Sequence, residues 1–568
     1  MKRGLTYLLL VVLILAATQA FAGAKITINN INAAGVGFND PTPATAVGGN
    51  TGATLGEQRL NAFKEAARIW GETLDSPAEI IINARFTALS CNATSAVLGS
   101  AGTTSVFGDI PGQTLLFPGT EFVDTWYHSA LADKVAGVDV NPGFADISAN
   151  FNVNLGNPGC LTGSFWYLGL DGKAPAGTID LVTVLLHEFA HGLGFSQFAS
   201  VSNGALFFGF PDVYNRQIFD DTLQKTWDQM TDAERVASSI NPRRVVFIGN
   251  NVSEALPGVL SQGVPGLRIA TPDSIAGHYE VGTASFGPAL TASGVTGQIV
   301  QAVDAADVAG PSTTDGCSAI TSDVAGKIAI VDRGTCSFVI KAANVQAAGA
   351  IAMIVADNAA GSPPAGLGGS DPSITIPAVR VSQPDGILIK AQLGSGVSGT
   401  LSLDLSLKAG ADQNDKALLY TPIPVAPGST ISHYDTIDFP NQLMEPNINS
   451  DLTHNVKPPY DLTLPLLRDV GWFPDADNDG LADNSDQCVQ SDLTAGNIKI
   501  GACDTTVPNR IFTNGCTIID YMNLAASGVK NHGGLASNTA QLGNALYEAG
   551  IITLTQKDQF QSCAVKKR

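Results

Sequence analysis

The chain has 568 residues, of which 44% are hydrophobic and 14% are charged, and its formal net charge at pH 7 is −20. This length is enough for several packed domains. Because a strongly acidic surface repels phosphate groups, we expect no nucleic-acid partner and no binding to anionic membranes.

The first 22 residues have the pattern of an export signal. Lys2 and Arg3 supply positive charge, residues 7–17 form a short apolar run, and residues 20–22 (Ala-Phe-Ala) offer a small-x-small cleavage site. The apolar run is too short for a membrane span, and no other run in the sequence is long and apolar enough for one. The pattern predicts a secreted, extracellular protein whose mature chain begins at Gly23.

Residues 23–200 have the pattern of one α/β unit. Apolar side chains recur at helical spacing from Leu55 to Leu74, which predicts an amphipathic helix. Residues 79–86 predict a strand, and residues 146–154 alternate between apolar and polar side chains, which predicts a half-buried strand. The second strand is either an ordinary strand or the sheet edge to which an extended peptide adds.

The stretch from Thr178 to Phe195 predicts a buried helix. Thr178 is a candidate N-cap, and Asp180 in the first turn complements the helix dipole. Gly192 and Gly194 are expected to break the helix, because glycine adopts left-handed conformations at low cost.

This helix carries a His-Glu-x-x-His motif. His187 and His191 are four residues apart, so they project from the same side of a helix and reach one metal ion. Glu188 lies beside them, where it acts as a general base on a water that the metal activates. The alternative is a core helix with two satisfied histidines, but the motif is rare by chance. The sequence therefore predicts a catalytic zinc site.

From about residue 283 to 405 the composition shifts to Gly, Ala, Val and Ile. We expect a strand and a tight turn at 326–338, a helix at 341–349, and strands at 350–356 and 376–381. The run resembles the protease-associated (PA) domain, a small β-rich module, above all in Asp332-Arg-Gly-Thr-Cys-Ser-Phe338 and Ala347-Ala-Gly-Ala350. The resemblance implies a non-catalytic insert that either steers substrates or is a tolerated insertion. For residues 205–280, the sequence predicts no chemistry.

A catalytic zinc usually has three protein ligands and one open position. One class of enzymes takes the third from a Glu about twenty residues downstream, but no Glu lies between Phe189 and Ala233. A second class uses His-Glu-x-x-His-x-x-Gly-x-x-His, and here the last position is Gln197 although Gly194 is in place. The candidate for the third ligand is His433, with His454 in reserve.

The segment around His433 carries a further resemblance. Met444 follows His433 by eleven residues in an expected tight turn, and metzincin peptidases place a Met turn beneath their zinc after the third His. Leishmanolysin-like metzincins also have an insertion between the glycine turn and that His. The chain resembles this arrangement in His187, Glu188, His191, Gly194, His433, Met444 and Leu466-Leu-Arg-Asp-Val-Gly-Trp472.

The resemblance implies an α+β protein with a metzincin-type catalytic domain of a twisted sheet and an active-site helix. We expect its first part at 23–282, the PA insert at 283–405, and its second part with the Met turn at 406–473.

An Asp-rich segment follows at residues 474–490. Its carboxylates are typical calcium ligands, and the segment resembles a thrombospondin type-3 repeat. The candidate ligands are Asp475, Asp477, Asp479, Asp483 and Asp486. The alternative is an acidic, solvated linker.

The remaining residues, 491–568, predict a small, mostly helical module held by disulfides. An even number of cysteines in an exported chain indicates disulfide bonds. We expect the local pairs Cys91–Cys160, Cys317–Cys336, Cys488–Cys503 and Cys516–Cys563.

The sequence therefore predicts a secreted zinc metalloendopeptidase that acts on proteins or peptides, with structural calcium. One alternative is a calcium-dependent adhesion protein on a metalloprotease scaffold, which would not need Glu188. Another is a zinc hydrolase with a substrate other than peptides; the PA resemblance favours peptides by analogy.

Overall fold

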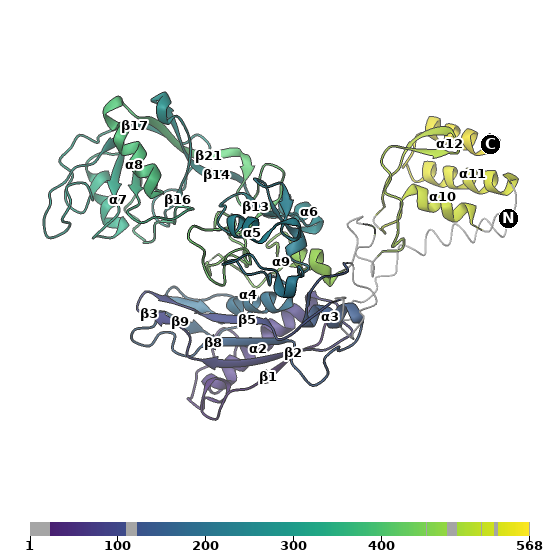
Figure 1. The fold of residues 1–568 in the computed structure, drawn as a ribbon, viewed down its shortest axis with the longest axis horizontal. Helices are drawn as coiled ribbons and strands as arrows, with labels where there is room; N and C mark the ends of the chain where they lie inside the picture. Colours follow the sequence, from purple (N-terminus) through teal and green to yellow (C-terminus); the bar gives the residue numbers. More distant parts are fainter. Residues whose placement is uncertain are drawn as a thin grey trace. The chain divides into compact units, whose positions relative to one another are not determined.

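The computed structural model describes residues 23–108, 122–449, 451–473, 477, 486–512, 514–527 and 532–566. The chain divides into two compact units, Ala24–Val470 and a C-terminal unit that starts at Gly471. The predicted export signal, residues 1–22, lies outside the described residues. Helices and sheets are mixed throughout, as the sequence predicts (Figure 1).

The first layer of the large unit is a four-stranded sheet in the order β1-β2-β8-β5. The first three strands are parallel, and β5 runs antiparallel at the edge. Its strands are β1 (Ile26–Asn30), β2 (Ile80–Thr87), β8 (Ile147–Asn152) and β5 (Gly99–Thr103).

Two helices cover the apolar face of this sheet. They are α2 (Leu55–Thr73), which begins with a Thr54–Glu57 capping box, and α4 (Leu181–Leu193). Phe63 of α2 lies 5.0 Å from the ring of Phe151 in β8 and 6.0 Å from the ring of Phe189 in α4. These edge-on aromatic contacts hold the motif helix firmly against the sheet.

The predicted helix at 55–74 and the strands at 79–86 and 146–154 are confirmed, and of the two alternatives for the last strand the structure has the ordinary strand, not the sheet edge. β8 is hydrogen-bonded on both sides, because Gly99–Thr103 pairs with it. This edge strand consists of small residues with a weak strand signal, so its pattern does not reveal it.

The second layer of the large unit is built from residues on both sides of the insert. Its small sheet has the order β12-β11-β13-β22, and its helices flank the sheet. The elements are β11 (Ile218–Asp220), β12 (Lys225–Thr226), β13 (Val245–Phe247), β22 (Ala417–Leu418), α5 (Asp232–Ser238), α6 (Asn250–Val259) and α9 (Thr463–Leu467).

Short elements complete the first half of the unit. They are α3 (Ser129–Ala136), β3 (Cys91–Asn92), β4 (Ser95–Ala96), β6 (Val106–Phe107), β7 (Tyr127–His128), β9 (Phe165–Tyr167) and β10 (Thr178–Asp180).

The insert forms an eight-stranded sheet in the order β15-β14-β21-β17-β18-β19-β20-β16. Two of its strands precede residue 283, so the sheet reaches further back than the shift in composition. Its helices are α7 (Phe338–Ala347) and α8 (Gln383–Gln392). Its strands are β14 (Gln262–Thr271), β15 (Gly277–Glu280), β16 (Gly282–Thr283), β17 (Val295–Gln301), β18 (Ile328–Asp332), β19 (Ala352–Ala356), β20 (Ala378–Val381) and β21 (Ser398–Lys408).

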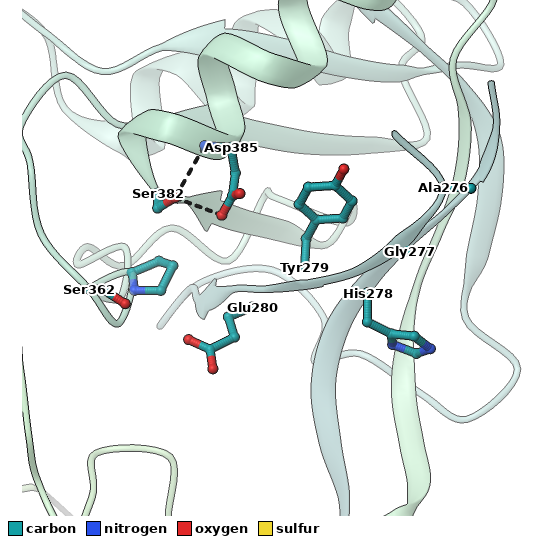
Figure 2. A pocket seen from close by; sticks show the side chains of 9 residues that line it. Ala276, Gly277, His278, Tyr279, Glu280, Ser362, Ser382 and Asp385 are labelled. Atoms are coloured by element: carbon teal, nitrogen blue, oxygen red, sulfur yellow. Dashed lines mark hydrogen bonds between the residues drawn. The ribbon is translucent and has the colours of Figure 1, made fainter. Parts of the chain in front are cut away.

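One side of the insert is hollowed by a pocket of about 410 Å³ (Figure 2). Its lining comes from three separate segments: strand β15, the loop that contains Ser362 and Pro364, and the start of α8. The predicted strands and helix of the PA-like run are confirmed within this sheet.

The C-terminal unit contains a hairpin and three helices around a small apolar core. These elements are β23 (Asn497–Ile500), β24 (Cys503–Pro508), α10 (Ile518–Ala526), α11 (His532–Glu548) and α12 (Leu554–Val565). Among the described residues of the whole chain, no helix has the length and apolarity that crossing a membrane requires.

All eight cysteines form disulfides, but two of the four predicted pairs are wrong. Cys91–Cys160 and Cys317–Cys336 are confirmed. In the C-terminal unit the pairs are Cys488–Cys516 and Cys503–Cys563, not Cys488–Cys503 and Cys516–Cys563. The pairing of nearest neighbours fails because α12 lies against β24, which brings Cys563 to Cys503.

Candidate functional site: a three-histidine centre

The helix α4 begins later than its sequence pattern predicts. Thr178 belongs to strand β10, and Asp180 is the N-cap, with its side chain accepting a hydrogen bond from the Thr183 N–H at 2.8 Å. Thr178 as the cap is therefore wrong, because the β10 pairing with β9 holds that residue extended. Gly194 ends the helix with φ of 134°, a conformation that favours glycine. Gly192 as a helix breaker is wrong, because it lies inside α4, where a Cβ atom would come within 2.6 Å of Cγ2 of Ile147.

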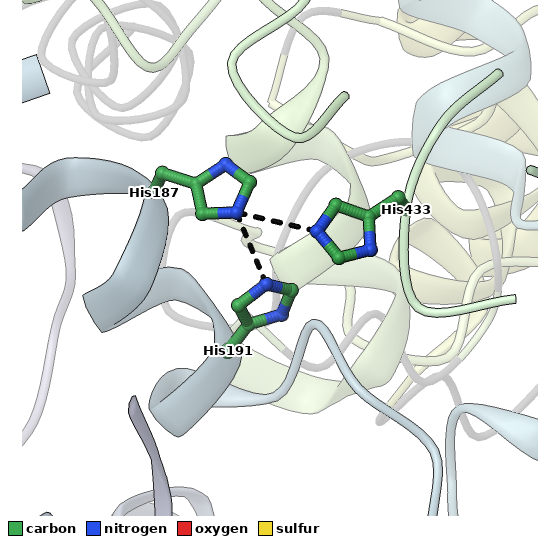
Figure 3. A group of neighbouring side chains, drawn as sticks. All are labelled: His187, His191 and His433. Atoms are coloured by element: carbon green, nitrogen blue, oxygen red, sulfur yellow. Dashed lines mark hydrogen bonds between the residues drawn. The ribbon is translucent and has the colours of Figure 1, made fainter. Parts of the chain in front are cut away.

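Three histidines from two distant segments meet in the interior. His187 and His191 project from α4, and His433 comes from the loop after β22 (Figure 3). The Nε2 atom of His187 lies 3.2 Å from that of His191 and 3.3 Å from that of His433. All three side chains are buried, so the predicted third histidine does join the motif.

Each imidazole is fixed by a backbone carbonyl. The Nδ1 atoms of His187, His191 and His433 lie 2.7, 2.8 and 2.9 Å from carbonyl oxygens. A carbonyl oxygen only accepts, so each Nδ1 carries the hydrogen, and in the neutral rings each Nε2 presents a lone pair. The carbonyls belong to Leu443, Phe195 and Ser429 respectively.

Three converging lone pairs repel one another unless a cation lies between them, and carbonyl-oriented neutral imidazoles are the ligands that zinc takes. Burial, reinforced by the charge of His191, lowers the pKa of His187 to about 3, and burial lowers that of His191 to about 4. Burial likewise lowers the pKa of His433 far below its usual value. The rings are therefore neutral at physiological pH, and the donor set fits a divalent zinc ion.

The segment with His433 is held by its own hydrogen bonds. The Tyr420 N–H donates to the His433 carbonyl at 2.9 Å, and the Tyr434 N–H donates to the Met444 carbonyl at 2.9 Å. Met444 is fully buried, and its neighbour Leu443 supplies the carbonyl that orients His187. The structure thus brings the predicted turn Met next to the histidine centre.

Glu188 lies between the centre and the edge strand β5. Burial raises the pKa of its carboxyl group to about 8, although a backbone hydrogen bond with Ala101 opposes the shift. Space is tight here, since a Cβ atom at Gly99 would lie 3.1 Å from Cγ of Glu188. The general-base candidate therefore sits directly beside the edge strand of the sheet as the described residues form it.

The reserve ligand does not reach the centre. His454 Nε2 lies 3.0 Å from Oδ1 of Asp180, so this histidine braces the start of α4. In the described part of the chain, His187, His191 and His433 are the one group of three or more His, Cys, Asp or Glu side chains arranged to hold a metal.

The calcium prediction is only partly within the described residues. Asp475, Asp479 and Asp483 lie outside them. Asp477 accepts a hydrogen bond from the Ser491 N–H, and Oδ1 of Asp486 accepts one from the Cys488 N–H at 2.7 Å. Calcium binding by this segment stays a prediction.

Sequence reasoning missed the groups that orient the histidines. The carbonyls of Phe195, Ser429 and Leu443 leave no trace in the side-chain pattern, because every residue has a carbonyl. It also missed Asp461, whose carboxylate accepts the Leu443 N–H at 2.6 Å and so supports the His187 partner.

Known proteins resemble part of this chain. The PA domain family matches residues 295–389, so a PA domain is present. Vacuolar-sorting receptor 2 of Arabidopsis thaliana is 34% identical over 148 residues, 24% of this chain and 24% of that protein. The minor extracellular protease Vpr of Bacillus subtilis is 37% identical over 78 residues, 14% of this chain and 9% of that protein. The probable lipoprotein aminopeptidase LpqL of Mycobacterium tuberculosis is 33% identical over 136 residues, 23% of this chain and 24% of that protein.

The chain thus spans about a quarter or less of the length of these relatives. Among solved structures, the aminopeptidase from Aneurinibacillus sp. strain AM-1 is 28% identical and covers 26% of this chain and 31% of that chain. Its TM-score is 0.19, which carries no argument about fold or activity.

Proposed function

We propose that the protein is a secreted zinc metalloendopeptidase of the metzincin type. The observation that carries this proposal is the convergence of three carbonyl-oriented histidine Nε2 atoms beside a buried glutamate. The buried Met444, which follows the Leu443 carbonyl at His187, and the long insert before His433 support the leishmanolysin-like arrangement. Two relatives with peptidase names support peptide substrates, although the similarity covers only a small share of each.

His187, His191 and His433 would hold the metal as neutral ligands. When bound, zinc acts as a Lewis acid that polarises a carbonyl group and acidifies water. Neutral ligands leave the ion its full charge, which favours this chemistry. The carbonyls that accept from the three Nδ1 atoms keep each ring in the tautomer that binds metal.

Glu188 would act as the general base. A divalent cation held by the histidines would oppose the raised pKa and favour the ionised form of this carboxyl group. The carboxylate would take a proton from the attacking water and deliver it to the nitrogen of the leaving amine. The hydrogen bond with the Ala101 backbone holds this side chain next to β5. The site therefore couples proton transfer to the strand where a substrate is expected.

The edge strand β5 is the proposed peptide-binding strand. No further strand of the described residues pairs with its outer side, so an extended peptide can add to the sheet there. This binding uses main-chain hydrogen bonds and needs no free peptide terminus. The arrangement therefore favours cleavage within a chain over removal of its terminal residue.

The test combines metal content with hydrolysis. Wild type, Glu188→Gln and the control Glu72→Gln, an exposed residue of α2, are purified with zinc and assayed on casein and on a peptide with a blocked N-terminus. We expect one zinc per chain in all three proteins, and a loss of about 10²- to 10⁴-fold in hydrolysis for Glu188→Gln alone.

Three results would contradict the proposal. If the wild-type protein binds no zinc and hydrolyses neither substrate, it is not a zinc peptidase. If Glu188→Gln keeps full activity, Glu188 is not the general base. Cleavage that requires a free N-terminus would replace the endopeptidase with an aminopeptidase.

A further inference from the structure

The pocket in the PA domain has the chemistry of a binding site for a cation. Two of its lining residues, Glu280 and Asp385, carry carboxylates, and none of its nine lining residues is Lys or Arg. The Glu280 side chain is 46% exposed, so it is open to a ligand. Figure 2 shows the Asp385 carboxylate beside the ring of Tyr279, and Glu280 on the side of Ser362.

The groups around the pocket are held in place. Oδ2 of Asp385 accepts a hydrogen bond from Oγ of Ser382 at 2.6 Å, and the Tyr279 hydroxyl donates to the Ile275 carbonyl at 2.7 Å. Burial and, to a lesser degree, the charge of Asp385 raise the pKa of Tyr279, so the carboxylate and the phenol are close. Asp385 retains a second oxygen, Oδ1, for a ligand.

The pocket therefore combines an aromatic ring, an apolar wall at Pro364 and two negative charges. A lysine or arginine side chain matches this set, because its alkyl stem packs on apolar surface and its charged head pairs with carboxylates and with ring faces. An acidic side chain would instead meet two carboxylates of its own charge.

The pocket is connected to the histidine centre through Arg243. Oε1 of Glu280 lies 3.9 Å from Nε of Arg243. The same guanidinium forms an ion pair with Asp435, which is two residues from His433 in the chain. Arg243 is largely buried, and burial lowers its pKa, whereas the charges of Glu280 and Asp438 raise it, so the guanidinium depends on the surrounding carboxylates for compensation.

A second connection runs through the backbone. Ser362, which lines the pocket, pairs with Ile423 by two hydrogen bonds of 3.1 and 2.7 Å between their N–H and carbonyl groups. Ile423 lies three residues after Tyr420, whose N–H donates to the His433 carbonyl. The pocket wall and the segment of His433 are thus joined at two independent places.

We propose that this pocket is an exosite that binds a lysine or arginine side chain of the protein substrate, and that its occupancy changes the support of His433 through Arg243 and Ile423. The role of the pocket as a substrate exosite rests on the proposed peptidase function, whereas the binding of a basic side chain does not. A bound cation competes with Arg243 for Glu280 and shifts Arg243 toward Asp435.

The binding test uses the inactive Glu188→Gln protein, so it does not depend on catalysis. The probe is a fluorescein-labelled decapeptide of Gly and Ser with one central Arg, and its counterpart carries citrulline, which has the same shape without the charge. Fluorescence anisotropy compares the parent with Glu280→Gln/Asp385→Asn. The control Asp307→Asn/Asp371→Asn changes the net charge equally at two carboxylates that do not line the pocket.

We expect the Arg peptide to bind at least five-fold more tightly than the citrulline peptide, and the pocket variant to abolish that preference while the control keeps it. Equal binding of both peptides, or equal loss in the control, would overturn the exosite. These outcomes are separate from failure of the proposed function, which the zinc and casein assays detect.

The coupling is read on the active enzyme. For a long substrate with a basic residue remote from the cleaved bond, Glu280→Gln/Asp385→Asn should raise KM several-fold, while the control Asp307→Asn/Asp371→Asn keeps the wild-type KM. Addition of the Arg decapeptide should change kcat for a short neutral peptide in wild type and not in the pocket variant. If the decapeptide leaves kcat unchanged, the link to His433 is wrong.

Discussion

The histidine centre and the PA-domain pocket hold their polar groups in opposite ways. At the centre, three buried rings are each fixed by one carbonyl from the backbone. At the pocket, Glu280 is exposed and its nearest cation, Arg243, is shared with Asp435. A site that must place atoms accurately uses fixed backbone partners, whereas a site that must exchange partners leaves its charges accessible.

The largest expected effect comes from removing a ring of the centre. His433→Ala should lose both stoichiometric zinc and all hydrolysis, because two ligands remain. The matched change His454→Ala removes a histidine that braces Asp180 instead, and should retain zinc. Metal analysis after dialysis measures both. Retention of zinc and activity by His433→Ala would show that the third ligand lies elsewhere.

A smaller loss of zinc affinity is expected when a residue that supports a histidine only indirectly is changed. Asp461→Ala removes the acceptor for the Leu443 N–H, and the Leu443 carbonyl orients His187. Changes to groups that orient a ligand typically cost about 10- to 100-fold in metal affinity. Competition with a zinc chelator measures the affinity, and Asp461→Asn, which keeps an acceptor oxygen, should restore most of it. Unchanged affinity in Asp461→Ala would make the backbone support dispensable.

Salt should separate the two sites. The Debye screening length falls from about 10 Å in 0.1 M salt to about 3 Å in 1 M salt, and salt screens mainly the exposed charges. Binding of the Arg decapeptide should therefore weaken about three- to ten-fold over this range, since Glu280 is exposed. Zinc content should stay constant. If zinc content and binding of the Arg decapeptide were equally sensitive to salt, the contrast between the buried centre and the exposed pocket would be wrong.

The smallest effect concerns a carboxylate away from both sites. Asp469 accepts the N–H groups of Asn251 and Val252 at 2.8 and 2.9 Å, and burial raises its pKa from 3.8 to about 6. The folded state therefore binds the proton more tightly than the unfolded state. This contribution to stability is complete below about pH 4 and is lost as pH rises through 6.

Urea unfolding across pH 4–7 tests this. In wild type the contribution of Asp469 to the unfolding free energy should fall by on the order of 2–3 kcal/mol between pH 4 and pH 7, and this fall should be absent in Asp469→Asn. The same variant should leave zinc content and peptide binding unchanged. A persistent pH slope in the variant would place its origin in another buried carboxyl group.

The sequence predicts those parts of the molecule whose chemistry lies in side chains. The spacing of His187 and His191 and the Met turn after His433 lead to a centre that the structure assembles across the 241 residues between His191 and His433. The PA-domain strands are equally visible in their Val and Ile runs. Periodicity fails for β5, because Gly and Ala carry little strand signal although the strand forms the sheet edge.

Partners chosen by tertiary packing are not readable in the same way. The local pairing of Cys488 with Cys503 fails because the return of α12 to β24 determines which cysteines meet. Arg243 lies in a region without a motif, and only folding brings it between Glu280 and Asp435. Long-range ion pairs of this kind have no spacing rule.

The way the chain enters and leaves the insert has a consequence for modularity. The first and last long strands of the insert, β14 and β21, are antiparallel partners, and Gln262 pairs with Lys408. Just outside them, the Ala409 N–H donates to the Ser261 carbonyl at 3.0 Å. Residues 261 and 409 are therefore already in contact. If the insert between them were deleted, a two- or three-residue linker could join them at little cost in loop-closure entropy. The insert can therefore be exchanged at one point of the chain, with the loss of the Glu280–Arg243 and Ser362–Ile423 contacts that join it to the segment of His433.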